Sequence, residues 1–126
     1  MQPGNTCISC HSSEGEGPIF TIAGTVMQTA AEPIECNGAF GAQVIITDSN
    51  GATFTLPTNA AGNFACGGGG GGGSFGACAG LTPPYHARVV TSAGERAMGS
   101  AQTSGDCNGC HTETGAGGAP GRIQAP

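Results

Sequence analysis

The sequence predicts an all-β protein, a small β-sandwich with a loop segment at each end of the chain. Short runs of β-branched and aromatic residues fill the middle of the chain, and clusters of Gly, Asn, Asp and Ser separate them. A nearly identical five-residue motif stands near each terminus, outside this middle part. We therefore divide the chain into an N-terminal segment (residues 1–18), a β-sandwich (19–97) and a C-terminal segment (98–126).

Three stretches predict strands of the sandwich: residues 19–26 (IFTIAGTV), 42–47 (AQVIIT) and 53–56 (TFTL). Residues 48–51 (DSNG) and 59–63 (NAAGN) are strong turn signals between and after these stretches. Closely spaced short strands with such turns are typical of a sandwich.

Composition excludes two classes of partner. The chain has 126 residues, a formal net charge of −5 and three cationic side chains, all of them Arg. A nucleic-acid-binding protein needs a basic patch, and three arginines cannot supply one. No apolar run is long enough to span a bilayer. We expect no nucleic-acid partner and no membrane span.

The motif at the two ends carries the chemistry. CISCH occupies residues 7–11, and CNGCH occupies residues 107–111. C-x-x-C-H is the attachment signature of c-type haem. Two thiols at this spacing form thioether bonds with the two vinyl groups of one porphyrin, and the adjacent His binds the iron. We therefore expect two covalently bound haem c groups. The residues expected to hold them are Cys7, Cys10 and His11 at the first site and Cys107, Cys110 and His111 at the second.

The match between the two sites continues beyond the pentads. Residues 7–17 and 107–117 both read C-x-x-C-H-[S/T]-x-x-G-x-G. Such a shared tail indicates a repeated haem-bearing loop. Glycine has no Cβ, so we expect these positions to let the backbone lie close to a flat macrocycle.

Two other functions of a C-x-x-C pair remain as alternatives. Four Cys could hold a structural zinc ion, but zinc-binding pairs usually stand about 15–20 residues apart and would leave both His unused. A thioredoxin-like redox motif needs a βαβ context, which this sequence lacks.

The remaining iron ligands are in short supply. Two haem irons take up to four axial ligands, and the chain has three His. If His11 and His111 are proximal ligands, only His86 is left, so other positions must be filled by Met, by a neighbouring chain, or stay open. In PPYHARVV, His86 and Arg88 share one strand face, with Tyr85, Ala87 and Val89 on the other. We expect His86 to bind iron, with a solvent-exposed His as the alternative.

Met98 is the second candidate ligand. It follows Arg96 by two residues, so both would lie on the same strand face. Core packing is the alternative for Met98 and the expectation for Met27. The turn near residues 92–94 could hold two residues or three, and a slip of one residue reverses the faces. The sequence therefore does not decide which face of the strand the Met98 side chain occupies.

Three further cysteines lie between the pentads. Cys66 and Cys78 bracket a run of seven consecutive Gly, and we expect a disulfide between them. Pairing of Cys36 with either one is the alternative, and one Cys remains in both cases. Haem c attachment implies an exported, oxidising setting, which favours such a bond.

The middle of the chain resembles a known family. GTV followed by GAQVIITDSNGATFTLPTNAAGNF is similar to the carboxypeptidase regulatory-like (transthyretin-like) β-sandwich, with its pattern G-x-V, G-A-x-V-x-[VIL]-T-[DN], T-[DN]-x-x-G-x-F. The resemblance covers roughly residues 20–91 and departs after Phe64, where the glycine tract begins. It implies an Ig-like, transthyretin-like sandwich, which is a scaffold without catalytic residues. The whole layout resembles small dihaem c-type cytochromes.

These observations predict an electron-transfer protein and not an enzyme. If the sandwich has an odd number of strands, its termini leave from opposite ends and the haems lie apart. Head-to-tail copies would then form a filament, similar in kind to the extracellular multihaem cytochrome nanowires of prokaryotes. The expected partners are copies of the chain, redox proteins and extracellular electron acceptors. A soluble periplasmic or cell-surface dihaem carrier and, more remotely, a peroxidase-like enzyme are the alternatives.

Overall fold

The computed structural model of the chain describes residues 2–15, 18, 20–33, 37–67 and 76–126. It is mostly β, with two sheets and two short helices in these residues, consistent with a small β-sandwich. The elements are α1 (Cys7–Glu14), β1 (Ile22–Met27), β2 (Gln43–Thr47), β3 (Thr53–Pro57), β4 (Asn63–Cys66), β5 (His86–Thr91), β6 (Gly94–Ala97), α2 (Cys107–Cys110) and β7 (Ile123–Gln124).

The larger sheet is antiparallel and has the strand order β3-β2-β5-β6. Its strands alternate as expected, because successive side chains point to opposite faces. Val44, Ile46 and Leu56 are buried, and so is Val89 opposite them on β5. These side chains form one wall of the main hydrophobic core.

The smaller sheet has the order β4-β1-β7, and β1 is its central strand. All six residues of β1 are buried. Ile22 and Val26 belong to the core between the sheets, whereas Ala23 packs with Cys7 and Phe20 in a second apolar cluster. Both faces of β1 are therefore covered, one by the other sheet and one by the N-terminal segment.

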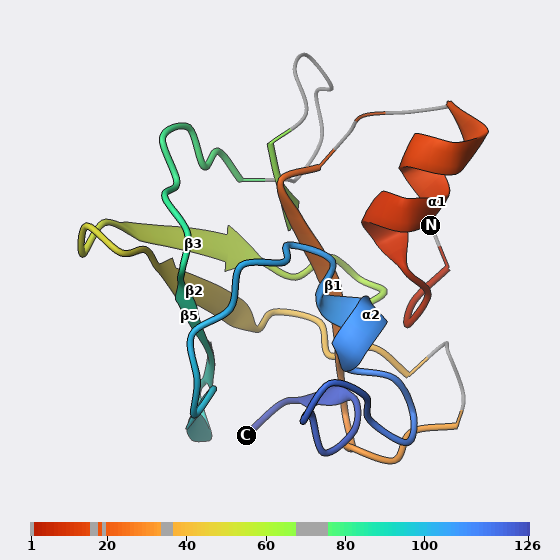
Figure 1. Cartoon of the computed structure of the whole chain (residues 1–126). Helices are drawn as coiled ribbons and strands as arrows, with labels where there is room; N and C mark the ends of the chain where they lie inside the picture. The colour runs from red at the N-terminus through yellow and green to blue at the C-terminus, as the bar shows by residue number, and fades with distance from the viewer. Residues whose placement is uncertain (1, 16–17, 19, 34–36, 68–75) are drawn as a thin grey trace.

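The expectation that the terminal segments are loops is wrong. Both pentads form short helices, and β7, which lies within the C-terminal segment, pairs in parallel with β1. Figure 1 shows both helices near β1, on the side away from the β2–β3 hairpin. Because a C-x-x-C spacing turns both Cys toward one side of a helical turn, a helical pentad presents the thiols together.

The predicted disulfide is confirmed. Cys66 and Cys78 are bonded, with their Cα atoms 5.6 Å apart. The alternative partner for these two residues, Cys36, lies outside the described residues, as does most of the glycine tract. The bond ties the end of β4 to the chain that leads into β5.

No helix in the part of the chain that the structure describes is long and apolar enough to cross a membrane.

Candidate functional site

The two pentads lie side by side, although they are a hundred residues apart in sequence. The Nδ2 of Asn108 donates a hydrogen bond to the backbone oxygen of Asn5 at 2.8 Å. The backbone amide of Ser9 donates to Oδ2 of Asp106 at 3.2 Å. The expectation that an odd number of strands places the sites at opposite ends of the sandwich is therefore wrong, because both terminal segments return to the central strand β1.

Asn108 holds the second pentad against β1. It is 2% exposed, and its Oδ1 accepts a hydrogen bond from the amide of Thr25 at 3.0 Å. Ala23, two residues earlier, donates to the backbone oxygen of Gly105 at 2.9 Å. The C-terminal segment therefore supplies partners along the edge of β1 before β7 begins, so that these buried amides are not left unpaired.

Gly24 allows α2 to approach this closely. A Cβ at this position would lie 2.7 Å from Cζ of Phe64 and 2.9 Å from Cβ of Cys107. Such distances are too short for any side chain, so the G-x-V sequence at residues 24–26 has a packing function here.

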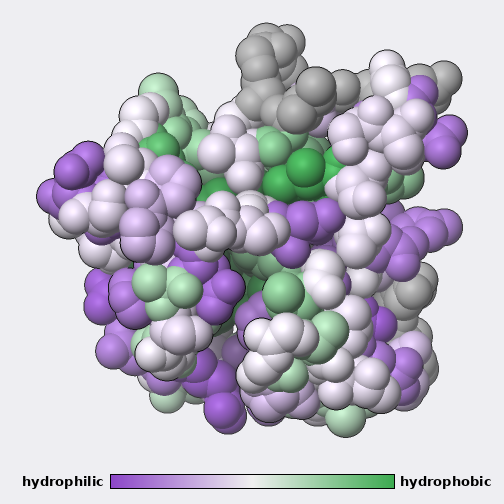
Figure 2. Space-filling model, viewed as in Figure 1, coloured by the Kyte–Doolittle hydropathy of each residue, from purple (hydrophilic) through white to green (hydrophobic). Residues whose placement is uncertain are grey.

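A cavity of about 410 Å³ opens between the β5–β6 hairpin and the C-terminal segment. In Figure 2 the surface is hollowed there, with apolar side chains beside the hollow. The volume lies within the ordinary range of about 300–1,000 Å³ for sites that bind small molecules and cofactors. Its lining includes Val44, Phe64, Tyr85, Val89, Met98, Cys107, Cys110 and His111.

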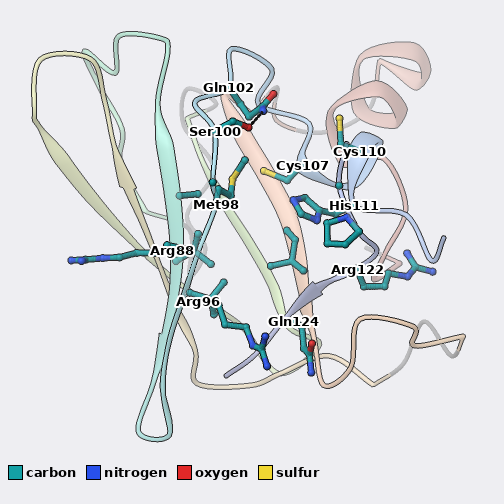
Figure 3. Close-up of a pocket in the computed structure, with 18 of the residues that line it drawn as sticks. Arg88, Arg96, Met98, Ser100, Gln102, Cys107, Cys110, His111, Arg122 and Gln124 are labelled. Carbon is teal, nitrogen blue, oxygen red and sulfur yellow. Dashed lines mark hydrogen bonds between the residues drawn. The ribbon is translucent and has the colours of Figure 1, made fainter. Parts of the chain in front are cut away.

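His111 is held in a defined orientation. It follows α2 directly, and its Nδ1 lies 2.9 Å from the backbone oxygen of Gly121. A hydrogen bond from one ring nitrogen to a backbone carbonyl fixes the tautomer and leaves the other nitrogen free to bind a metal. Figure 3 shows His111 on the C-terminal side of the cavity, across from the strand that leads to Met98.

The pairing register of the β5–β6 hairpin determines which of its side chains face this cavity. Thr91 pairs with Gly94, so the turn has two residues, and Val89 pairs with Arg96. The amide of Met98 donates to the backbone oxygen of Ala87 at 2.9 Å. Because directly paired residues share a face, Arg96 and Met98 lie on the inner face and line the cavity.

His86 and Arg88 lie on the opposite, outer face, as predicted from the alternating pattern. His86 is exposed and does not line the cavity. Nη1 of Arg88 lies 3.6 Å from a carboxylate oxygen of Glu95, in an exposed ion pair. Iron binding by His86 stays a prediction, and from this face its imidazole points away from the cavity that contains His111.

The N-terminal pentad presents its residues differently. Cys7 is buried against Phe20 and Ala23, whereas Cys10 is exposed. The ring centroid of His11 lies 5.1 Å from that of Phe20. Nδ1 of His11 is buried and has no hydrogen-bond partner in the described part of the chain. His11 thus lacks the orienting hydrogen bond that Nδ1 of His111 makes to the backbone oxygen of Gly121.

The thiols nearest β1 are kept neutral. Burial raises the pKa of Cys7, and the carboxylate of Asp106 adds to the effect. Burial, followed by Asp106, raises the pKa of Cys107 to about 12. Zinc ligands and redox-active cysteines act as thiolates and occupy electropositive surroundings, which these are not. In the residues that the structure describes, no three His, Cys, Asp or Glu side chains form a metal-binding group. The raised thiol pKa values disfavour a function that depends on thiolates, whereas a thioether carries no charge and tolerates burial.

The shared glycine tail has a conformational cause as well. Gly15 ends α1 with φ of 66°, and the equivalent Gly115 has φ of 79°. These values favour glycine strongly. Gly117 lines the cavity, where a Cβ would lie 3.1 Å from Sγ of Cys110. Gly15 and Gly115 thus allow the turn that follows each pentad. At the second site, Gly117 lets the backbone lie close to the cavity.

Asn108 and Asp106 were not predicted from the sequence. Asn108 stands at an x position of the pentad, where the first site has Ile8, and a motif does not predict the role of its variable positions. A polar residue in a pentad next to a buried strand is the one signal that could have found it.

Met27, which was expected in the core, is fully buried.

Comparison with known proteins finds no matching family model, no matching curated protein and no matching solved structure. The interpretation of the two pentads therefore rests on their residues and on the geometry described above.

Proposed function

We propose that this chain is a dihaem c-type cytochrome that transfers electrons between its two haems and to a partner. The observation that carries the proposal is that two C-x-x-C-H pentads lie side by side on β1, linked by the hydrogen bond from Asn108 to Asn5. Two cofactors bound at these pentads would be neighbours in space, which would allow direct electron exchange between them. When bound, haem c supplies a one-electron iron couple whose potential the protein tunes.

The residues of the second site fit haem. Cys107 and Cys110 lie on one helical turn at the cavity, where both can form thioethers. His111, oriented by the carbonyl of Gly121, is the proposed proximal ligand. Val44 and Phe64 give the inner part of the cavity an apolar wall. Apolar surroundings of this kind disfavour the more highly charged, oxidised state of a bound iron.

Met98 is the proposed distal ligand at this site. It faces the cavity from the strand side, whereas His111 faces it from the C-terminal side. Its thioether is a soft ligand that raises the potential of a haem iron relative to a second His. At the first site, Cys7, Cys10 and His11 are the proposed haem residues, because they repeat the motif and spacing of the second site.

The sandwich is proposed to be Ig-like and transthyretin-like, because the sequence over roughly residues 20–91, with a departure after Phe64, resembles that family. The disulfide between Cys66 and Cys78 supports an oxidising location outside the cytoplasm, which haem c attachment also requires. We propose an extracellular or cell-surface protein, with the periplasm as the alternative.

Assembly of copies into a conductive filament stays a proposal, but on a different basis from the one first expected. The two pentads of one copy are neighbours, so separation of the haems no longer supports it. What supports it is the position of His86, which is exposed on the outer face, outside the cavity lining, and is therefore accessible to an iron of a neighbouring copy. Electron microscopy of purified haem-loaded protein should show polymers. Monodisperse monomer at high concentration would favour the soluble carrier.

Haem content tests the central function. The chain should be produced with export and haem-attachment machinery, denatured, and analysed by mass spectrometry and by the pyridine haemochrome spectrum. We expect the mass of two haems beyond that of the chain. A Cys7→Ser/Cys10→Ser variant and a Cys107→Ser/Cys110→Ser variant should each retain one haem. A Cys66→Ser/Cys78→Ser variant is the matched control and should retain two. Unmodified mass in the parent protein would refute the proposal.

A further inference from the structure

The three arginines of the chain occupy three different environments. Arg88 pairs with Glu95 on the outer face of the β5–β6 hairpin. Arg122 is 9% exposed, and its Nη1 donates to the backbone oxygen of Gly4 at 2.9 Å. All three arginines contribute to the cavity lining, but no carboxylate among the described residues forms an ion pair with Arg96. Arg96 is therefore the cation that the fold leaves available at the cavity.

The cavity has two chemically different ends. Figure 3 shows Cys107 and Cys110 at one end, and Arg96 and Gln124 at the other. The same view shows the guanidinium of Arg88 directed away from the cavity, as the strand register requires, because Arg88 pairs with Ala97 and Val89 with Arg96. Arg122 also points away from it. One end thus offers thiols and the opposite end offers a guanidinium and a carboxamide.

A porphyrin of the haem type has the same polarity. Its vinyl groups, which form the thioethers, lie on one edge, and its two propionates lie on the opposite edge. Guanidinium groups bind carboxylates through paired, charge-assisted hydrogen bonds. We propose that Arg96, together with Gln124 at the same end of the cavity, is the propionate-binding group of the site formed by Cys107, Cys110 and His111. This inference rests on the proposed function and fixes which way round the cofactor lies.

The charge of Arg96 has a predictable effect on potential. A cation near the cofactor disfavours the oxidised iron, which carries one more positive charge than the reduced iron. Removing that cation therefore lowers the reduction potential. Because Arg96 is exposed at the mouth of the cavity, the effect should weaken as salt increases.

The test compares Arg96→Gln with Arg88→Gln in the full, haem-loaded chain. Both variants remove one charge from the same hairpin, on opposite faces. Potentiometric titration followed by visible absorption should show that Arg96→Gln lowers the reduction potential of one haem by about 59 mV. For a one-electron couple this shift is about a tenfold change in the equilibrium constant for reduction. Arg88→Gln should leave both potentials unchanged, and Arg96→Lys should give a smaller shift. The Arg96→Gln shift should persist in the Cys7→Ser/Cys10→Ser background.

The outcomes separate this inference from the proposed function. Two bound haems with potentials unaffected by Arg96→Gln would overturn the assignment of Arg96 alone. An equal shift in Arg88→Gln would also overturn it, because the effect would then be general to the hairpin. Absence of covalent haem from the parent protein would refute the proposed function itself.

Discussion

Asn108 and Thr25 exchange two hydrogen bonds. The amide of Thr25 donates to Oδ1 of Asn108 at 3.0 Å, and Nδ2 of Asn108 donates to Oγ1 of Thr25 at 3.1 Å. Oγ1 of Thr25 in turn donates to Oδ1 of Asn63 at 2.7 Å and accepts from the amide of Gly4 at 2.9 Å. One side chain within the second C-x-x-C-H pentad thus joins both ends of the chain to the central strand.

Asn108→Ala tests this link. The substitution leaves the buried Thr25 amide and the Asn5 carbonyl without their partner, and each unsatisfied group costs about 1–3 kcal/mol. We expect the free energy of unfolding of the haem-loaded protein, measured in guanidinium chloride, to fall by about 2–4 kcal/mol. Asn50→Ala, at an exposed turn, is the control and should change it by less than about 0.5 kcal/mol. Equal effects of the two variants would show that Asn108 does not hold the segments together.

Gly24→Ala tests the close approach of α2 to β1. The added Cβ meets Phe64 and Cys107 at distances below 3.0 Å, so α2 must move. Overpacking of this kind costs about 1–3 kcal/mol. We expect lower stability and reduced haem attachment at the second pentad, measured by mass spectrometry of a Cys7→Ser/Cys10→Ser background.

The control for Gly24 is Gly99→Ala, because a Cβ at Gly99 meets nothing within 4 Å. Full haem attachment in the Gly24 variant would contradict the packing explanation.

Tyr85 gives a pH dependence. Its hydroxyl donates to the backbone oxygen of Ser104, and burial raises its pKa, with smaller contributions from Cys107 and Cys110. The folded chain thus binds the phenol proton more tightly than the unfolded chain, in which tyrosine titrates near pH ~10. The stability that this provides is fully present below that pH and is lost as pH rises above it.

Tyr85→Phe should therefore remove part of the alkaline loss of stability, while costing about 1 kcal/mol at neutral pH through the lost hydrogen bond. Thermal unfolding of both proteins between pH 7 and pH ~11 measures this. Parallel stability curves for the two proteins would show that Tyr85 does not titrate abnormally.

The Cys66–Cys78 disulfide should stabilise the sandwich. It closes a loop between residues that are 12 apart in sequence, and loops of about this length gain about 3 kcal/mol in the chain-entropy model. We expect Cys66→Ser/Cys78→Ser to lower the free energy of unfolding by about 2–4 kcal/mol. Cys36→Ser is the control, and mass spectrometry after alkylation should still find the bond intact. Loss of the bond in that variant would reassign the pairing.

Local patterns predicted the strands well, because residues such as Val44, Ile46 and Val89 alternate with polar neighbours and a sheet needs that period. They also predicted the face of His86. The direction of Met98 needed the length of the hairpin turn, which the sequence left open. The nearness of the two pentads depends on long-range contacts of β1 with Gly105 and Asn108, and no local pattern contains these. The helical form of the pentads was not predicted because segments of four to eight residues are too short to show the 3.6-residue period of a helix.

The arrangement of the two haems relative to each other is the claim on which the electron-transfer account depends. Circular dichroism of the oxidised, haem-loaded protein in the Soret region tests it directly, because two neighbouring porphyrins couple and split the signal into a pair of opposite sign. We predict a split signal in the parent protein that disappears in both variants with one haem, Cys7→Ser/Cys10→Ser and Cys107→Ser/Cys110→Ser. A parent spectrum equal to the sum of the two single-haem spectra would contradict the account.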